Sequence, residues 1–443
     1  MTPRRRMVPV LGGLLLSLGA LVAAAPASPL PDLEHAARPL RSTEPSGDLA
    51  DLRPLGRMVA GAQVVGLGEA THSSHEFFTL KHRVFRYLVE RQGFRTFALE
   101  DSWSTGQRLN DYVLHGKGDI RRIMREEFQE SYSWWNNREY LELLEWMRSY
   151  NRQHPDDPVR FMGDDFAYAG PELYDKVTGY AARAHPELLP RFTELYRGLR
   201  PVTDAGTYMR EYLKRPPAAR REMARRTGQA LALLKRQTPA GPAGRTAHEW
   251  AVQHATAIDQ TARGYAFDFD DQRQVAAAMR YRDSVMAANV LWWNQHTGSK
   301  ILLSAHDAHV SHKTFDPDNY PKVQGEFLRD RLGKRYLNIA TTFGQGSFNA
   351  TGPDGKVTRH TVGPARPGSN ERTLDRVRYR DYVLDLRKVA STGRDWLGRA
   401  RPTRSIGTAY PGPGTEYPVA LGRSYDVLIH LHRVRAARLL GSS

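Results

Sequence analysis

A strand, a polar loop, a helix and a second strand follow one another between Ala62 and Glu100, and this order constrains the fold most strongly. Residues 63–67 form a short apolar run closed by glycines, which predicts a buried parallel strand. Apolar residues at helical spacing predict a helix over residues 74–92, and residues 94–99 form the second strand. Parallel strands need a crossover connection such as this helix, so the stretch predicts an α/β protein.

The start of the predicted helix carries a specific signal. Ser73 is followed three residues later by Glu76, a spacing typical of a capping box, and Gly93 is placed to end the helix. We therefore expect the loop before Ser74 to lie at the helix N-terminus, directly after the first strand.

Further strands alternate with helical segments along the rest of the chain. The predicted strands are residues 159–163, 300–304, 336–341, 382–386 and 426–432. We predict an α/β fold with a mostly parallel central sheet flanked by helices, and an all-helical insertion forming a lid over the active-site edge. The expected domains are a signal peptide (1–27), a flexible leader (28–51), the first part of the α/β core (52–170), the helical insertion (171–264) and the second part of the core (265–443).

The first residues have the pattern of an export signal. Arg4, Arg5 and Arg6 precede an uncharged apolar stretch over residues 10–25, and Ala25-Pro26-Ala27 matches a small-residue cleavage site. We expect a cleaved signal peptide, no stable membrane anchor, and a protein that is secreted or held in the cell envelope.

Composition excludes several functions. The 443-residue chain has no cysteine, which rules out disulfides and thiolate metal sites. Its 64 basic and 48 acidic residues give a net charge of +16, but the basic residues are scattered along the chain. We therefore predict no nucleic-acid partner.

Acids and histidines follow successive predicted strands. Glu69 and His72 follow the first strand, Glu100 ends the second, and His306 and His309 follow the strand at 300–304. The carboxyl ends of parallel strands open on one edge of a sheet, so these five side chains are candidate catalytic residues. The candidate substrate-binding residues are His75, Glu76, Lys81 and Arg282.

The expected chemistry is general-base catalysis. A histidine just before a helix N-terminus is disfavoured as a cation, so His72 can act as a neutral base. Glu69 or Glu100 would orient it and stabilise its protonated form. His306 and His309 would donate hydrogen bonds to a developing oxyanion, and Lys81 could add positive charge.

Other chemistries fit the sequence less well. No G-x-S-x-G motif occurs, which argues against a nucleophile-elbow serine hydrolase. His75 and Glu76 begin like H-E-x-x-H, but Thr79 stands at the second histidine. A dinucleotide site is disfavoured because Glu69 would repel a pyrophosphate. A metal bound by Glu69, His72, Glu100 and one of the later histidines stays open.

Several motifs in this order resemble those of the erythromycin esterase family. They are Gly68-Glu69-Ala70-Thr71-His72, Glu76-Phe77-Phe78, Leu99-Glu100, Glu142-Leu143-Leu144-Glu145-Trp146, Arg282-Asp283 and Ala305-His306-Asp307-Ala308-His309-Val310. The resemblance covers nearly the whole chain after the signal peptide and is weakest in the helical insertion and the tail.

The resemblance implies a metal-independent hydrolase without cofactors, which opens the macrolactone ester of macrolide antibiotics and confers resistance. It places the water-activating histidine at His72, and Lys81 stands where the family has an arginine. The expected partner is a small-molecule ester such as a macrolide, and the expected state is a monomer. The alternatives are a metal-dependent hydrolase using the same cluster, and a non-catalytic envelope or polysaccharide-associated binding protein.

Overall fold

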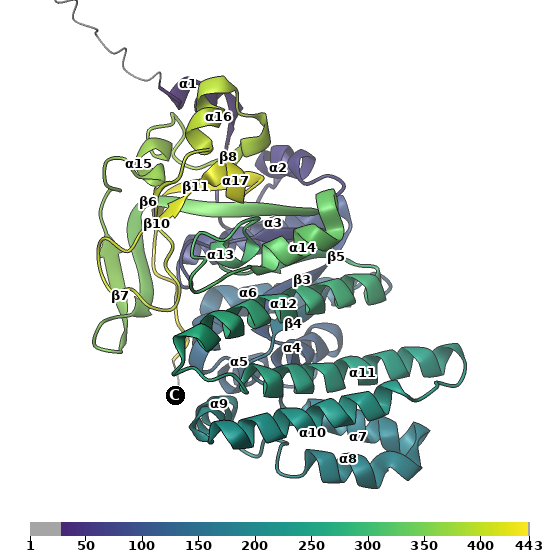
Figure 1. Ribbon diagram of the computed structural model, residues 1–443. Coiled ribbons are helices and arrows are strands. Elements are labelled where there is room, and N and C mark those ends of the chain that lie inside the picture. Colours follow the sequence, from purple (N-terminus) through teal and green to yellow (C-terminus); the bar gives the residue numbers. More distant parts are fainter. Residues whose placement is uncertain (1–27, 442–443) are drawn as a thin grey trace, which may run out of the picture.

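The computed structural model describes residues 28–441, so the predicted signal peptide lies outside the described residues. A nine-stranded sheet forms the centre, and helices cover its faces (Figure 1). The strands are β1 (Ala37–Pro39), β2 (Val64–Leu67), β3 (Phe94–Ser102), β4 (Arg160–Asp165), β5 (Lys300–Ser304), β6 (Tyr336–Thr351), β7 (Val357–Val362), β8 (Tyr382–Asp385) and β11 (Val427–Val434). A separate small sheet pairs β9 (Arg401–Thr403) with β10 (Tyr417–Val419).

The sheet is mostly parallel, as predicted. Its order is β1-β8-β11-β6-β2-β5-β3-β4, with β7 paired to the far part of β6. The six strands from β11 to β4 run parallel, whereas β1, β8 and β7 are antiparallel to their neighbours. β2 lies between β6 and β5 and is buried along its whole length, so the loop after it starts near the middle of the sheet.

Helices connect the strands and form a second group beyond the edge strand β4. The helices around the sheet are α1 (Leu30–Ala36), α2 (Arg53–Met58), α3 (His75–Gln92), α4 (Trp103–His115), α5 (Ile120–Glu127), α6 (Arg138–Gln153), α12 (Gln272–Thr297), α13 (Asp307–Val310), α14 (Gln324–Leu332), α15 (Asn370–Leu374), α16 (Ser391–Leu397) and α17 (Leu421–Ser424). The second group, at the lower end of Figure 1, comprises α7 (Pro171–Ala184), α8 (Leu189–Tyr196), α9 (Ala205–Lys214), α10 (Pro217–Lys235) and α11 (Gly241–Gly264).

The fold needs glycine at two places, one at the end of a helix and one where two strands and a helix pack closely. Gly93 ends α3 in the left-handed conformation at φ 71°, which L side chains rarely adopt. On β4, a Cβ at Gly163 would lie 2.0 Å from the Ser102 carbonyl oxygen of β3. Gly106 of α4 packs against the backbone of Gly163. These contacts bring α4 directly onto the strands that carry the polar edge.

Two local predictions are wrong. The segment over residues 28–51 is folded rather than flexible, because β1 pairs with β8 and Asp51 forms a buried ion pair with Arg83 of α3. The capping box is also absent. Ser74 caps α3 without a side-chain hydrogen bond, and the Glu76 carboxylate instead accepts hydrogen bonds from the backbone and side chain of Arg435. In both places the structure is set by contacts with residues that are distant in the sequence.

Other predicted elements are present with shifted ends. β6 continues ten residues beyond the predicted Thr341 and supports β7, which was not predicted. Trp134 and Trp135 belong to a 3₁₀ turn, and α6 begins only at Arg138. Over residues 28–441, no helix has the length and apolar character needed to cross a membrane.

Candidate active site

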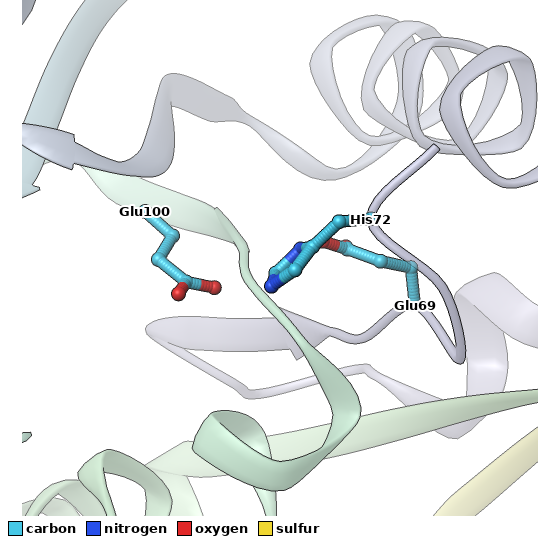
Figure 2. A group of neighbouring side chains, drawn as sticks. All are labelled: Glu69, His72 and Glu100. Atoms are coloured by element: carbon cyan, nitrogen blue, oxygen red, sulfur yellow. The ribbon is translucent and has the colours of Figure 1, made fainter. Parts of the chain in front are cut away.

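The loop after β2 carries His72 into the interior of the molecule. His72 is 7% exposed, and its Nδ1 lies 3.1 Å from Oε1 of the fully buried Glu69 (Figure 2). Lys81 of α3 reaches the same loop from the helix and forms an ion pair with the other oxygen of Glu69. Its ammonium also donates to Ser304 Oγ at 2.9 Å, at the end of β5. Glu69 is therefore held from both sides, and it fixes the orientation of the His72 ring.

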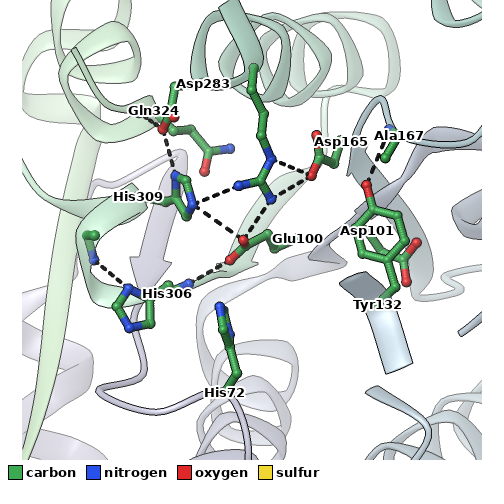
Figure 3. Close-up of polar contacts among 12 residues, drawn as sticks. His72, Glu100, Asp101, Tyr132, Asp165, Ala167, Asp283, His306, His309 and Gln324 are labelled. Carbon is green, nitrogen blue, oxygen red and sulfur yellow. Dashed lines mark hydrogen bonds and ion pairs between the residues drawn. The ribbon is translucent and has the colours of Figure 1, made fainter. Parts of the chain in front are cut away.

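Glu100, on β3, is held in place by three donors (Figure 3). Its Oε2 accepts a hydrogen bond from the His306 backbone N–H at 2.9 Å, and its Oε1 lies 2.9 Å from Arg282 Nη2 and 3.3 Å from His309 Nε2. Arg282, from α12, also donates to Asp165 Oδ2 through Nε and Nη2 at 2.8 and 2.7 Å. Groups from the segment after β5 and from the helix α12 thus meet at the carboxylate on β3, and Arg282 links it to Asp165 of β4.

His306 and His309 lie at the two ends of the short helix α13. The Nδ1 of His306 accepts a hydrogen bond from Ala308 N at 3.3 Å, which places the ring proton on Nε2. That Nε2 is buried without a partner among the described residues, and the ring lies 4.9 Å from the His72 ring. His309 donates from Nδ1 to Asp283 Oδ1 at 2.7 Å, an Asp that sequence reasoning did not select.

Burial separates the protonation states of these groups. It lowers the pKa of His72 to about 4, although Glu100 opposes the shift. Burial likewise lowers the pKa of His306 well below its ordinary value. For His309, burial is outweighed by the carboxylates of Asp283 and Glu100, which raise the pKa. At neutral pH the site therefore holds two neutral imidazoles beside one that favours the cationic form.

The pKa of Glu100 moves in the opposite direction from that of an ordinary buried acid. Burial would raise it, but the charges of His309 and Arg282 and the hydrogen bond from the His306 N–H hold the pKa below its ordinary value. For Lys81, burial lowers the pKa, while nearby carboxylates, led by Asp307, oppose the shift. Glu100 thus stays a carboxylate next to the neutral His72.

These groups open into a cavity of about 490 Å³, within the range of small-molecule sites. His72, Glu100, His306, His309 and Arg282 all line it. The wall is largely apolar and aromatic, and it comes from the 3₁₀ turn before α6, from α9, from the loops around α12 and α13, and from β10. Its apolar members are Tyr132, Trp135, Phe166, Met209, Leu213, Tyr265, Phe269, Met279, Phe315, Tyr320 and Tyr417. Helix α9 brings the helical segment into this wall.

Four of the predicted site residues do not line the cavity, and one of them is Glu69, which orients His72 from behind. Lys81 is fully buried behind Glu69 and acts on the loop rather than on the cavity. His75 points away from it and bridges Glu139 at 2.6 Å and Glu44 at 2.9 Å. Glu76 is paired with Arg435. His75 and Glu76 are therefore misassigned as substrate-binding residues, because the start of α3 turns their side chains toward the N- and C-terminal segments.

Other residues of the site were not selected from the sequence. Asp165 lies two residues after the predicted strand at 159–163, and it anchors Arg282. Its position at a strand end, like that of Glu100, was the available signal. Trp135, which packs edge-on against His72 with ring centroids 5.3 Å apart, follows no predicted strand, so the sequence gives no such signal for it.

Glu69, His72 and Glu100 are also the group whose geometry approaches a metal site. One ligand atom from each lies within 4.8 Å of the others. These donor types suit several divalent metals. However, the Lys81 ammonium already forms an ion pair with Glu69, and a divalent cation would have to share this carboxylate with it.

The fold and the site define an α/β protein with a buried histidine–carboxylate cluster at the carboxyl edge of its parallel sheet, opening into an aromatic cavity. The chain belongs to the erythromycin esterase family, whose model matches residues 89–434. The match begins within α3, so Glu69 and His72 precede it.

Known proteins share this architecture. The erythromycin esterase type II of Escherichia coli is 24% identical over 335 residues, covering 71% of this chain and 77% of that protein. A solved structure described as a succinoglycan biosynthesis protein is 28% identical, covers 93% of this chain and 98% of its own, and superposes with a TM-score of 0.82. An erythromycin esterase mutant in its open conformation is 19% identical, covers 91% and 98%, and has a TM-score of 0.71, which shows the shared fold.

Proposed function

We propose that this protein hydrolyses a carboxylic ester of a small molecule with an apolar body, using His72 as the general base. One observation carries the proposal. A buried imidazole whose pKa is lowered to about 4 lies against the cavity, with Nδ1 bonded to Glu69 and the rest of the ring directed toward Glu100 (Figure 2). Such a ring is neutral at working pH and presents the Nε2 lone pair as a base.

The first step is attack of water on the ester carbonyl. Nε2 of His72 removes one proton from the water as its oxygen forms a bond to the carbonyl carbon, and the carbonyl π electrons move onto oxygen. The Nε2–H of His306, buried and without a partner within residues 28–441, is available to donate to this oxyanion. The Glu100 carboxylate stabilises the imidazolium formed at His72.

The second step reverses the proton transfer. The oxyanion re-forms the carbonyl and the bond to the alcohol oxygen breaks, while His72 returns its proton to the leaving oxygen. The products are one carboxylic acid and one alcohol, or a single hydroxy acid from a cyclic ester. Glu69 keeps Nδ1–H bonded throughout, so that the same ring nitrogen works in both steps.

A macrolide is the first substrate to test, since relatives of this chain are erythromycin esterases. Erythromycin and a panel of simple esters are incubated with wild type and His72→Ala, and the products are weighed by mass spectrometry. The gain of one water, lost in the mutant, is the expected result. Equal rates for the two proteins would reject His72 as the base. No turnover of any ester would favour a non-catalytic binding protein.

A metal-dependent hydrolase is the second candidate, supported by the three ligand atoms within 4.8 Å. Metal analysis of purified protein, with activity measured before and after chelation, separates the two mechanisms. Activity that survives chelation supports the general-base mechanism. Activity that disappears and returns with one metal supports the alternative.

We also propose that the protein is exported with cleavage after Ala27, on the strength of the N-terminal sequence pattern. N-terminal sequencing of protein recovered outside the cytoplasm should begin at Ser28. Recovery of the uncut chain from the cytoplasm would reject export.

A further inference from the structure

The loop that carries His72 is held from outside the cavity by groups that take no part in the proposed hydrolysis. Ser73, the next residue, is fully buried. Its carbonyl oxygen accepts hydrogen bonds from the backbone N–H groups of Asn349 and Ala437, both at 3.1 Å. Its hydroxyl oxygen accepts a third, from Asn349 Nδ2 at 3.0 Å. The backbone beside His72 is therefore tied both to β6 and to the segment that follows β11.

The side chain of Asn349 joins these two anchors. Asn349 lies on β6 and is 8% exposed, and its Nδ2 donates to Ser73 Oγ and to the Ala437 carbonyl oxygen, each at 3.0 Å. An asparagine nitrogen has two hydrogens to donate, so both are used here. Loss of this side chain would leave two buried acceptors without their donor.

The segment after β11, residues 435–440, contacts two separate parts of the site. Ala436 forms an antiparallel β-bridge with Ser74, at the start of α3, and Leu439 forms one with Asn137, just before α6. The Leu439 side chain is 41% exposed, so this second pairing rests on backbone hydrogen bonds. One segment thus connects the loop before α3 with the 3₁₀ turn before α6.

The loop and the turn carry two rings that contact each other. The His72 ring packs edge-on against Trp135, with centroids 5.3 Å apart, and the Trp135 indole N–H donates to the Glu100 carbonyl oxygen at 3.0 Å. A shift of the loop relative to the turn would open this contact and admit water to the imidazole. A buried imidazole stays neutral only while water is excluded from it.

We propose that Asn349 is a positioning residue for His72: together with residues 435–440, it fixes the loop so that the ring stays packed against Trp135 and its Nε2 faces the cavity. The inference rests on the proposed role of His72 as the base. Asn349 does not line the cavity, and it acts through Ser73 on the adjacent His72. Displacing a catalytic group by about 1 Å is enough to slow a reaction strongly.

The test compares Asn349→Leu with Asn151→Leu in the full chain. Asn151 is the matched control, because it is 5% exposed, its amide also donates to two backbone carbonyl oxygens, at 3.0 and 2.8 Å, and it lies near the opposite end of α6 from Asn137. The first readout is the titration of the His72 imidazole, followed by NMR with labelled histidine. We expect its pKa to rise from about 4 toward the ordinary value of about 6.5 in Asn349→Leu and to stay unchanged in Asn151→Leu.

The second readout is hydrolysis of any ester that wild type turns over. In Asn349→Leu, kcat should fall about tenfold with KM within about twofold of wild type, because the base is displaced while the cavity wall is kept. Ser73→Ala removes only the hydroxyl acceptor, so it should give smaller changes in the same direction, and it carries the test if Asn349→Leu does not fold.

Two results would overturn the positioning role: an unchanged His72 titration in the folded variants, or an equal change in Asn151→Leu. If wild type hydrolyses no ester but the titration shifts as expected, Asn349 positions His72 and the proposed hydrolysis falls.

Discussion

The inner and outer sides of the junction between β2 and α3 carry two histidines three residues apart, and their environments are opposite. His72, on the inner side, has its pKa lowered to about 4 by burial, and it faces a cavity. On the outer side, the hydrogen bond that His75 donates to Glu139, and then the one to Glu44, raise the pKa of His75 against the effect of its partial burial. Burial thus favours the neutral form of the ring on one side, whereas on the other side two carboxylates favour its charged form.

The comparison teaches that sequence proximity says little about protonation. Solvent exclusion dominates for His72, because the hydrogen bond of Nδ1 with Glu69 and the nearby charge of Glu100 do not overcome the cost of burying a cation. For His75 the two carboxylates each contact one ring nitrogen, and the side chain is 13% exposed. Four experiments test this difference between His72 and His75 and the contacts around them, and the largest effect is expected at His72.

Replacing His72 with Ala should lower kcat/KM about 10²–10⁴-fold for any ester that wild type hydrolyses, because the general base is lost. His75→Ala is the matched control and should stay within about threefold of wild type, since its ring lies outside the cavity. Steady-state kinetics with circular dichroism on both variants provides the measurement. Comparable losses in the two variants would remove the distinction between the two sides.

Removing Arg282 should destabilise the fold by about 3–5 kcal/mol, because Glu100 and Asp165 would both lose a buried partner. Arg273→Ala on the same helix is the control, since its ion pair with Asp271 is largely exposed and contributes about 0–1 kcal/mol. Urea unfolding of both variants measures the difference. A loss below about 1 kcal/mol for Arg282→Ala would mean that the network at the cavity is solvated.

The value of kcat/KM should stay high down to about pH 4, where His72 takes up a proton. It should not fall near the ordinary histidine pKa of about 6.5. The sign follows from burial, which favours the neutral, active ring. Rates measured from pH 3.5 to 8, together with a check of folding at each pH, give the pH at which kcat/KM falls on the acid side. A half-maximal rate near pH 6.5 would show that His72 is hydrated.

His75→Gln should cost about 1–2 kcal/mol of stability, and only at low pH. The raised pKa means that the contribution of His75 is complete below about pH 6.5 and disappears as the pH rises through the folded-state value. Unfolding of wild type and variant at pH 5.5 and pH 9 measures it. If the two proteins differ more in their free energy of unfolding at pH 9 than at pH 5.5, His75 does not stabilise the fold as a cation bound to Glu139 and Glu44.

Most of the histidine–carboxylate cluster could be found from the sequence because parallel strands end at the same edge. Glu69, Glu100 and His306 each follow a strand that could be recognised from a short apolar run, so their convergence needed only the order of strands. The mostly parallel α/β fold followed from the same runs and is confirmed.

Residues on α3 and in the cavity wall could not be placed in this way. His75, Glu76 and Lys81 were assigned to substrate binding, but each helical position turns the side chain by about 100° and sends them to different surroundings. The aromatic wall comes from α9, the 3₁₀ turn and β10, which share no period in the sequence.

The alternation of strands and helices follows from the sequence alone, because hydrophobic periodicity and strand ends are local properties. That alternation also indicates the sheet edge at which these residues lie: Glu69, His72, Glu100, His306 and His309. Only the tertiary structure decided which of two nearby histidines is neutral, which carboxylates are paired, and which surface closes the cavity. Those outcomes depend on burial and on contacts between segments as far apart as Glu76 and Arg435, where the energy of a charge is set by its neighbours in space.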